Sequence, residues 1–206
     1  FFNRLLGDTD ITEEDESTLE GVESILDICQ TTYHPPRTLQ WHYRSQHESL
    51  IAFSNRHFYD NRLIVFPSPH GHNQGLGLRY HYIANAIYDN RRNHDEAKRL
   101  ADAVINHFLE YPDESLGVVT LNITQRDLIE EELERRFKHY TEADTFLQRW
   151  EMEYFPFFVK NLENVQGDER DVIFISTTFG RNPQGVVRMN FGPINQEMGW
   201  RRLNVL

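Results

Sequence analysis

A run of polar side chains between two apolar segments is the part of this sequence whose residue types are best suited to binding a ligand. Residues 166–170 read Gln-Gly-Asp-Glu-Arg, and the run Val172–Thr177 that follows is β-branched and aromatic. Such a run is typical of a buried strand. Because α/β proteins often keep a ligand where a polar loop meets a buried strand, the sequence predicts a ligand-binding loop at residues 163–171.

Several familiar catalytic patterns are missing from the sequence. It contains no Gly-x-x-x-x-Gly-Lys-Ser/Thr phosphate loop, and the isolated Gly75-Leu-Gly77 is typical of a plain loop. The pair His70 and His72 has no cysteine and no second pair at ligand spacing, so no metal site is expected. Neither Ser45 nor Ser176 lies in a Gly-x-Ser-x-Gly elbow, which argues against a serine nucleophile.

The apolar periodicity predicts the elements that must position the polar loop. Strands are expected at 38–43, 78–83, 117–121, 155–160 and 172–178, helices at 17–29, 46–59, 97–108 and 124–137, and loops at 60–77 and 180–198. Ser17 and Ser45 begin capping boxes, and Thr124 can cap the helix expected at 124–137. The solvent-facing side of that helix should carry Glu130, Glu131, Glu132 and Glu134. Residues 139–153 are polar and show no clear period. Helices that alternate with short strands favour an α/β fold with a mostly parallel sheet and helices on both faces.

Aromatic residues at the start of the strand expected at 155–160 allow a second interpretation. Tyr154, Phe155, Phe157 and Phe158 could stack on nucleic-acid bases. A core strand is the favoured interpretation, because aromatic side chains are enriched in strands.

Charge is distributed unevenly along the 206 residues. The formal net charge is -11, and residues 1–30 hold nine acids and one base, so they contribute -8. The chain shows no overall basic surface, so any nucleic-acid contact should be local or shared with another domain. The single cysteine, Cys29, excludes a disulfide framework within the chain. With no signal-like or membrane-spanning run, a cytoplasmic protein without a membrane partner is expected. The start at Phe1 and the end at Leu206 suggest a fragment of a larger protein.

Three stretches carry motifs at consistent spacing. Residues 39–48 read LQWHYRSQHE and lead into Phe-Ser-Asn and Phe-Tyr, residues 165–176 read VQGDERDVIFIS, and residues 201–206 read RRLNVL. In this order they resemble the second RecA-like lobe of superfamily 1 helicases, in the branch related to nonsense-decay and DNA2-type enzymes. The second stretch is similar to motif V of that family and the third to the start of motif VI. The resemblance covers residues 37–206, which implies a C-terminal RecA-like lobe of P-loop NTPase type, preceded by an acidic lead-in and helix at 1–36.

The resemblance implies roles for individual residues. Arg44 matches an arginine that contacts the γ-phosphate of ATP, where a guanidinium stabilises charge on the transferring phosphoryl group. Glu169 matches the acid that accepts a hydrogen bond from the ribose hydroxyl, and Gly167 lets the backbone approach the nucleotide. Arg202 belongs to the nucleotide-binding start of motif VI, and Gln166 couples the motif V loop to nucleic acid.

One further match lies between the motifs. Gly117-Val-Val-Thr and Gln125 fit a strand-then-helix piece at which many relatives have Thr-Pro-Tyr, and Gln125 is assigned to nucleic-acid coupling on this basis. The Leu121-Asn-Ile that stands here departs from that pattern.

The resemblance also implies partners and a division of labour. ATP and Mg²⁺ should be held mainly by an N-terminal RecA-like lobe of the same protein, and single-stranded nucleic acid, with DNA favoured, should be the substrate. Because hydrolysis needs a phosphate cradle and metal ligands that this chain lacks, we expect the parent to be an ATP-dependent helicase and this chain alone to be inactive. A degenerate RecA-like binding or regulatory module is the alternative, and an unrelated nucleotide-binding domain is a third possibility.

Overall fold

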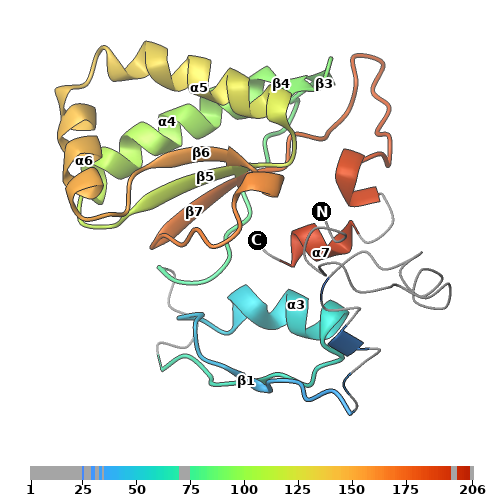
Figure 1. Ribbon diagram of the computed structural model, residues 1–206. Helices are drawn as coiled ribbons and strands as arrows, with labels where there is room; N and C mark the ends of the chain where they lie inside the picture. Colours follow the sequence, from blue (N-terminus) through green and yellow to red (C-terminus); the bar gives the residue numbers. More distant parts are fainter. Residues whose placement is uncertain are drawn as a thin grey trace, which may run out of the picture. The chain divides into compact units, whose positions relative to one another are not determined.

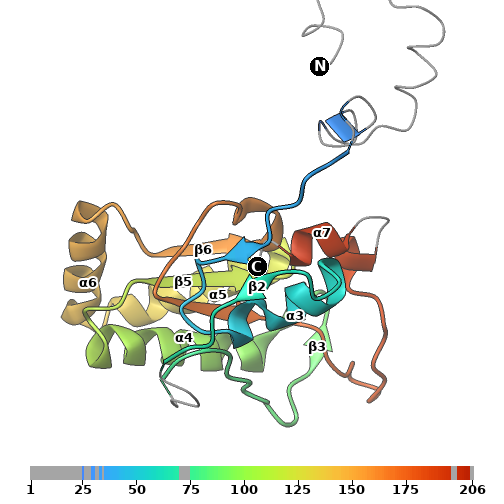
Figure 2. The ribbon, with the colours of Figure 1, turned by 90° about the horizontal axis from the view of Figure 1, so that it is seen from below.

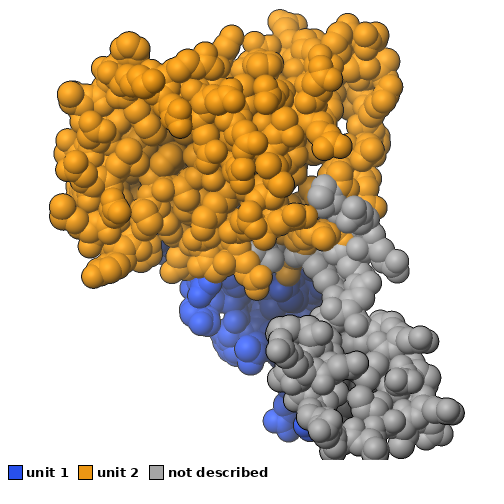
Figure 3. Space-filling view, turned by 45° about the horizontal axis from the view of Figure 1, so that its top comes forward, with its two compact units in different colours: residues 1–77 blue, residues 78–206 orange. Residues whose placement is uncertain are grey.

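The computed structural model describes residues 25, 29–30, 33, 35–69, 75–195 and 199–204 of the chain. These residues belong to two units, residues 1–77 and residues 78–206, which Figure 3 colours separately. The acidic lead-in and most of the helix predicted at 17–29 lie outside the described residues.

The second unit is built around strand β5 (Leu116–Thr120), all of whose residues are buried. Strands β6 (Phe158–Asn161) and β7 (Val172–Ser176) flank β5 on either side and pair with it in parallel. Val118 lies opposite Val159 on one side and Phe174 on the other. A central strand of a parallel sheet is buried on both faces, which explains the continuous apolar run in β5.

Three helices pack on one face of this sheet: α4 (His94–Glu110), α5 (Ile123–Phe137) and α6 (Thr141–Met152). Figure 1 shows α4 and α5 running along the strands, and Figure 2 shows α6 standing at the end where β6 begins. Their apolar residues join Leu116 and Val118 in the main core, which includes Ala97, Leu100, Ala101, Val104, Phe108, Leu128, Ile129, Leu133, Phe146 and Trp150.

A smaller apolar cluster lies on the opposite face of the sheet. Val119 and Phe158 pack there with Leu162, which belongs to the short helix η2 (Leu162–Asn164). Ile194 of η3 (Gly192–Asn195) packs against the same cluster. The chain then enters α7 (Trp200–Leu203), which contacts both η2 and η3.

A two-stranded hairpin precedes α4 in the second unit. Strands β3 (Tyr88–Asp89) and β4 (Arg92–Asn93) are antiparallel, with Asp89 opposite Arg92. One isolated bridge connects the residue before this hairpin to the segment after β7, because Ile87 pairs with Arg181, and a second bridge within that segment pairs Arg181 with Val187.

The first unit contains strand β1 (Trp41–His42), helix α3 (Ser49–Phe58) and strand β2 (Ile64–Val65). β1 and β2 are parallel, with Trp41 opposite Ile64, and the rings of Trp41 and Phe66 stack with centroids 5.4 Å apart. The side chain of Asn55 bonds to the backbone of Leu63 through both its oxygen and its nitrogen, which ties α3 to the approach of β2.

The predicted fold class is confirmed: the protein is a mixed α/β structure with a parallel three-stranded sheet. The strand predicted at 78–83 is wrong, because these residues form no ladder with a neighbour and Tyr80 and Tyr82 stack on each other instead. The loop predicted at 60–77 contains β2, and residues 139–153 contain α6. The domain boundary expected after residue 36 stays a prediction.

Three predictions about helix ends and faces are also wrong. Ser45 does not cap α3, since Glu48 is the N-cap residue and the Ser45 hydroxyl bonds to His42. Asn122, not Thr124, caps α5. Glu132 is only 4% exposed, because two arginines of its own helix hold its carboxylate.

Candidate functional site

The loop between β6 and β7 runs back along the length of the sheet. It leaves the carboxyl end of β6, passes through η2, and must reach the amino end of the parallel strand β7. Leu162 and Val165 hold its first part against the sheet. Asp171, at the end of the loop, lies at the amino ends of β5 and β7 beside Ser115.

Three charged residues of this loop are used to anchor it. The Lys160 ammonium donates to Asp168 at 2.7 Å, and the Arg170 guanidinium donates to the Pro156 carbonyl at 2.6 and 3.1 Å. The Asp171 carboxylate accepts from the backbone N–H and the hydroxyl of Ser115, at 2.8 and 2.6 Å. These contacts reach β6, the turn before β6 and the residue before β5.

Arg170 illustrates how firmly the anchors are packed. Its guanidinium lies over the ring of Phe158, with 4.8 Å between the guanidinium carbon and the ring centroid. Burial lowers the pKa of Arg170 below its ordinary value, although the carboxylates of Asp168 and Glu169 act in the opposite direction. A guanidinium held in this way is part of the scaffold of the loop.

The residues that the sequence assigns to ligands are exposed. Gln166, Gly167 and Glu169 are all exposed, as is the anchor Asp171, whereas the anchors Asp168 and Arg170 are half-buried. Gly167 has a φ of 85°, a conformation that favours glycine, and a Cβ added there would meet nothing within 4 Å. The backbone at Gly167 is therefore open to approach from outside. The roles of these three residues stay predictions.

Arg202 is placed next to the same loop. Its Nε lies 3.6 Å from Oε1 of Glu163 in η2, and the two side chains are 38% and 45% exposed. The contact is long and partly solvated, so it orients the guanidinium without strong binding. Among the predicted site residues of the second unit, Gln166, Gly167 and Glu169 share the loop after η2, and Arg202 contacts Glu163 within η2.

Gln125 lies in a different, fully buried environment. Its side-chain oxygen accepts from the Asn93 N–H at 2.8 Å, and its side-chain nitrogen donates to the Asn93 carbonyl at 3.1 Å. Both polar groups of its amide are occupied by one residue. Coupling to nucleic acid stays a prediction for Gln125, and with its exposure at 0% it would act by positioning the turn at Asn93.

The polar network around Gln125 was not foreseen from the sequence. Asn93 caps α4 through the Glu96 N–H at 3.1 Å and donates to the Thr178 carbonyl at 3.2 Å. The Glu96 carboxylate accepts from the Ser176 hydroxyl at 2.9 Å and from the Thr178 N–H at 3.1 Å. Asn93-x-x-Glu96 and Asn122-x-x-Gln125 both have capping-box spacing, which is the signal that could have identified these residues.

Arg44 lies in the first unit, where the structure describes its local surroundings. It is exposed and follows β1 in the turn 42–45. His42 closes this turn, because its Nε2 accepts from the Ser45 N–H at 3.2 Å and lies 2.7 Å from the Ser45 hydroxyl. Burial, and secondarily the positive charge of Arg44, lower the pKa of His42.

Two further features of the described residues bear on the kind of site present. Within the described ranges, no three His, Cys, Asp or Glu side chains are grouped closely enough to hold a metal ion. Among the residues that the structure describes, every helix is too short or too polar to cross a bilayer.

Comparison with known proteins identifies the family. Residues 22–206 match the AAA_12 family, which is described as an AAA domain. An uncharacterized ATP-dependent helicase of Mycoplasma pneumoniae is 35% identical over 175 residues, which cover 81% of this chain and 14% of that protein. An uncharacterized ATP-dependent helicase of Mycoplasma genitalium is 34% identical over 208 aligned positions, which cover 95% of this chain and 17% of that protein.

The chain thus spans about one sixth of the length of these relatives. The family match extends across both units and all three motif stretches. The chain therefore belongs to the AAA_12 family of AAA domains, and the resemblance of its motifs to the superfamily 1 helicases is confirmed.

Proposed function

We propose that this chain is the C-terminal motor lobe of an ATP-dependent helicase or translocase that acts on single-stranded nucleic acid. The observation that carries this proposal is the form of the loop at 165–171. Its charged residues Asp168, Arg170 and Asp171 fix it to the sheet, while Gln166, Gly167 and Glu169 remain exposed to a ligand. The relatives named as ATP-dependent helicases support the same function.

The loop suits the sugar end of a nucleotide. The exposed Glu169 carboxylate would accept a hydrogen bond from a ribose hydroxyl, which is an acceptor-only role for an ionised acid. The open backbone at Gly167 would let the nucleotide approach without collision. Arg202, on the neighbouring helix, would add a positive charge that favours phosphate.

Arg44 would supply the catalytic contribution of this lobe. A bound nucleotide brings Mg²⁺ and a transferable γ-phosphoryl group, and both would be held mainly by the N-terminal lobe of the parent protein. Arg44 would stabilise the negative charge that spreads over the γ-phosphoryl oxygens during transfer. Arginine suits this role because its guanidinium is planar, permanently charged and able to donate two parallel hydrogen bonds.

The decisive experiment measures ATP hydrolysis by the full-length protein with and without single-stranded DNA. Arg44→Ala should lower kcat by at least about 10³-fold, as loss of an arginine finger does. Arg56→Ala is the matched control, since Arg56 is an exposed arginine of the same unit with no assigned role. It should leave kcat within about twofold of the wild-type value, since exposed substitutions away from a site have small effects.

Glu169→Gln tests the second role in the same assay. We expect a higher KM for ATP and little change in kcat, because a ribose contact is made equally in the ground state and the transition state. Replacing the DNA by RNA of the same sequence tests the proposed preference for DNA. A full-length protein without ATPase activity would refute the motor function and favour a regulatory module. Activity that survives Arg44→Ala would refute the catalytic assignment alone.

A further inference from the structure

We propose that residues 86–93 and 179–191, here called the hairpin–loop surface, bind the phosphate backbone of a single-stranded nucleic acid. This surface lies outside the residues that the helicase motifs assign. The inference rests on the proposed function in one respect, namely that the protein binds nucleic acid. Its evidence is independent, since it comes from the charge and geometry of two segments that no motif includes.

The two segments are distant in sequence but joined in the fold. The Tyr88 N–H donates to the Arg181 carbonyl at 2.8 Å, and Arg181 is bridged in turn to Ile87 and Val187. Aromatic side chains continue the connection, because the Phe179 ring lies 5.3 Å from Tyr88 and 5.2 Å from Phe191 between centroids. The β3–β4 hairpin and the loop after β7 therefore present their side chains from one connected structure.

This surface has the opposite charge to the rest of the chain. It contains four arginines and one acid, Asp89, which gives a net charge of 4 − 1 = +3 in a chain whose net charge is -11. The segment 179–191 contains no acid at all. Arg91, Arg181 and Arg188 are exposed. A local group of arginines on an acidic protein is suited to a polyanion, because each phosphate contact releases condensed counterions.

The positive φ of Arg91 suggests that its side chain is kept at this position for a function. Asn90 and Arg91 form the two-residue turn of the hairpin, with φ values of 47° and 64°. A turn with both central residues at positive φ favours Asn followed by Gly, because a side chain at the second position is strained. Asn90 fits this preference and Arg91 does not. Strained residues tend to occur where the side chain serves a function, and here that side chain is an exposed guanidinium at the tip of the hairpin.

The segment that leads into the hairpin favours a single strand over a duplex. Tyr80 and Tyr82 are 83% and 70% exposed, and their rings stack with centroids 6.5 Å apart. Arg79 and His81 alternate with them. Exposed aromatic rings interleaved with basic residues are typical of surfaces on which unpaired bases stack. The exposed apolar residues Val186, Val187 and Met189 could instead meet a protein, and the experiment distinguishes this outcome.

The test compares binding of a fluorescein-labelled oligothymidylate to variants of the full-length protein by fluorescence anisotropy across a salt series. Arg91→Gly removes one charge and relieves the strained turn. We expect about fourfold weaker binding at 0.15 M salt and a salt slope shallower by about 0.7, the change for one lost phosphate contact on a single strand. The melting temperature should stay equal or rise, a result that a merely structural role of Arg91 would not produce.

A triple variant and a control complete the design. Arg91→Gly combined with Arg181→Ala and Arg188→Ala should weaken binding about 50-fold and reduce the slope by about 2. Lys138→Ala removes an exposed charge at the opposite end of α5 and should change affinity less than twofold. If the wild type binds and the triple variant binds equally well, the hairpin–loop surface serves a protein partner and the inference is wrong. If the wild type does not bind, the proposed function itself fails.

Discussion

Single residues in the loop at 165–171 divide into two groups by what they contact. Asp168, Arg170 and Asp171 each hold the loop through a contact on the sheet or next to it, whereas Gln166 and Glu169 are exposed residues of the same loop. The sequence alone could not separate these groups, because all of them are polar and adjacent. Only the positions of Lys160, Pro156 and Ser115, which the fold brings to the loop, decide which side chains anchor it to the sheet.

At the same scale, His42 makes the turn that carries Arg44 sensitive to pH. Its Nε2 accepts from the Ser45 N–H, which requires an unprotonated nitrogen. Because the folded-state pKa of His42 is lowered from 6.5, the unfolded chain binds the proton more tightly. The turn should therefore lose stability as pH falls below about 6.5, toward the folded-state pKa, and regain it above that value.

Proton NMR of the imidazole of His42 and of the Ser45 amide checks this expectation. The titration midpoint of the imidazole should lie below 6.5, and the Ser45 amide should shift with the same midpoint. His42→Gln, whose side-chain oxygen accepts without titrating, should leave the Ser45 amide unresponsive between pH 5 and 7.5. A midpoint above 6.5 would contradict the expected direction.

At the scale of elements, the sequence predicts those parts of the fold whose side chains keep a regular period. The stripe in α4 and the continuous apolar runs of β5 and β7 are found close to their predicted places. The alternating residues 78–83 predict a strand that is absent, because alternation cannot show whether a partner strand exists. β2 and β3 have two residues each, so their partners and not their own sequences define them.

The contact between α4 and α5 also involves a polar link that periodicity does not reveal. Gln125, at the third position of α5, satisfies the N–H and carbonyl of Asn93, the N-cap of α4. Gln125→Leu keeps the volume but removes the partner of the buried Asn93 N–H and one of the donors to the Asn93 carbonyl. We expect a loss of about 3 kcal/mol in unfolding free energy, measured by urea denaturation. Gln148→Leu on the exposed face of α6 is the control, and an equal effect of both changes would contradict the role of Gln125.

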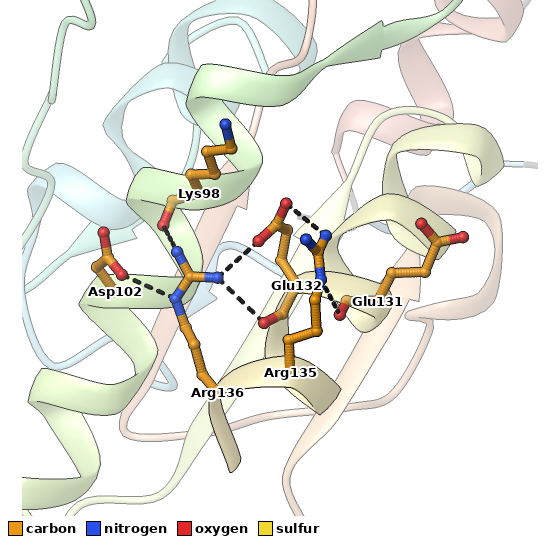
Figure 4. A network of polar contacts seen from close by, with 6 residues as sticks. All are labelled: Lys98, Asp102, Glu131, Glu132, Arg135 and Arg136. Carbon is orange, nitrogen blue, oxygen red and sulfur yellow. Dashed lines mark hydrogen bonds and ion pairs between the residues drawn. The ribbon is translucent and has the colours of Figure 1, made fainter. Parts of the chain in front are cut away.

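A second link between the same helices is an ionic network, shown in Figure 4. Arg136 of α5 donates to Asp102 of α4 at 2.8 Å, to the Lys98 carbonyl at 3.2 Å and to the buried Glu132 carboxylate at 2.7 Å. Burial of the Arg136 guanidinium acts to lower its pKa, but the hydrogen bonds to Asp102 and Glu132 outweigh this and raise it. The guanidinium therefore stays charged and holds the two helices together.

Removal of the Arg136 side chain should lower the free energy of unfolding, because it leaves the buried Glu132 carboxylate paired with only one cation, Arg135. We expect Arg136→Ala to reduce the unfolding free energy by about 3 kcal/mol, the lower end for a broken buried pair. Arg135→Ala is the matched control, since Arg135 donates to the same carboxylate from a side chain that is 62% exposed. Its loss should cost at most about 1 kcal/mol. Thermal melts of both variants give the comparison, and equal losses would show that burial does not distinguish the two arginines.

At the scale of the whole molecule, the two units differ in what they bury. The second unit has a main core between its sheet and three helices and a smaller core on the other face. Among the described residues of the first unit, the buried side chains are His47 and Ser54, each 9% exposed, and no apolar side chain is buried. Leu50 and Phe53 of α3 are about half exposed. Because burial of apolar surface is the main favourable term in folding, stability should reside in the second unit.

Separate expression of the two units tests this asymmetry. Residues 78–206 should unfold in one cooperative transition in urea, because they contain both apolar clusters and the polar links between α4 and α5. Residues 1–77 alone should show no cooperative transition, since the part of this unit that the structure describes buries no apolar side chain to offset conformational entropy. Circular dichroism and amide hydrogen exchange of each piece give the readout. A cooperative transition in residues 1–77 would show that this unit folds by itself, and the absence of one in residues 78–206 would show that its core needs the first unit.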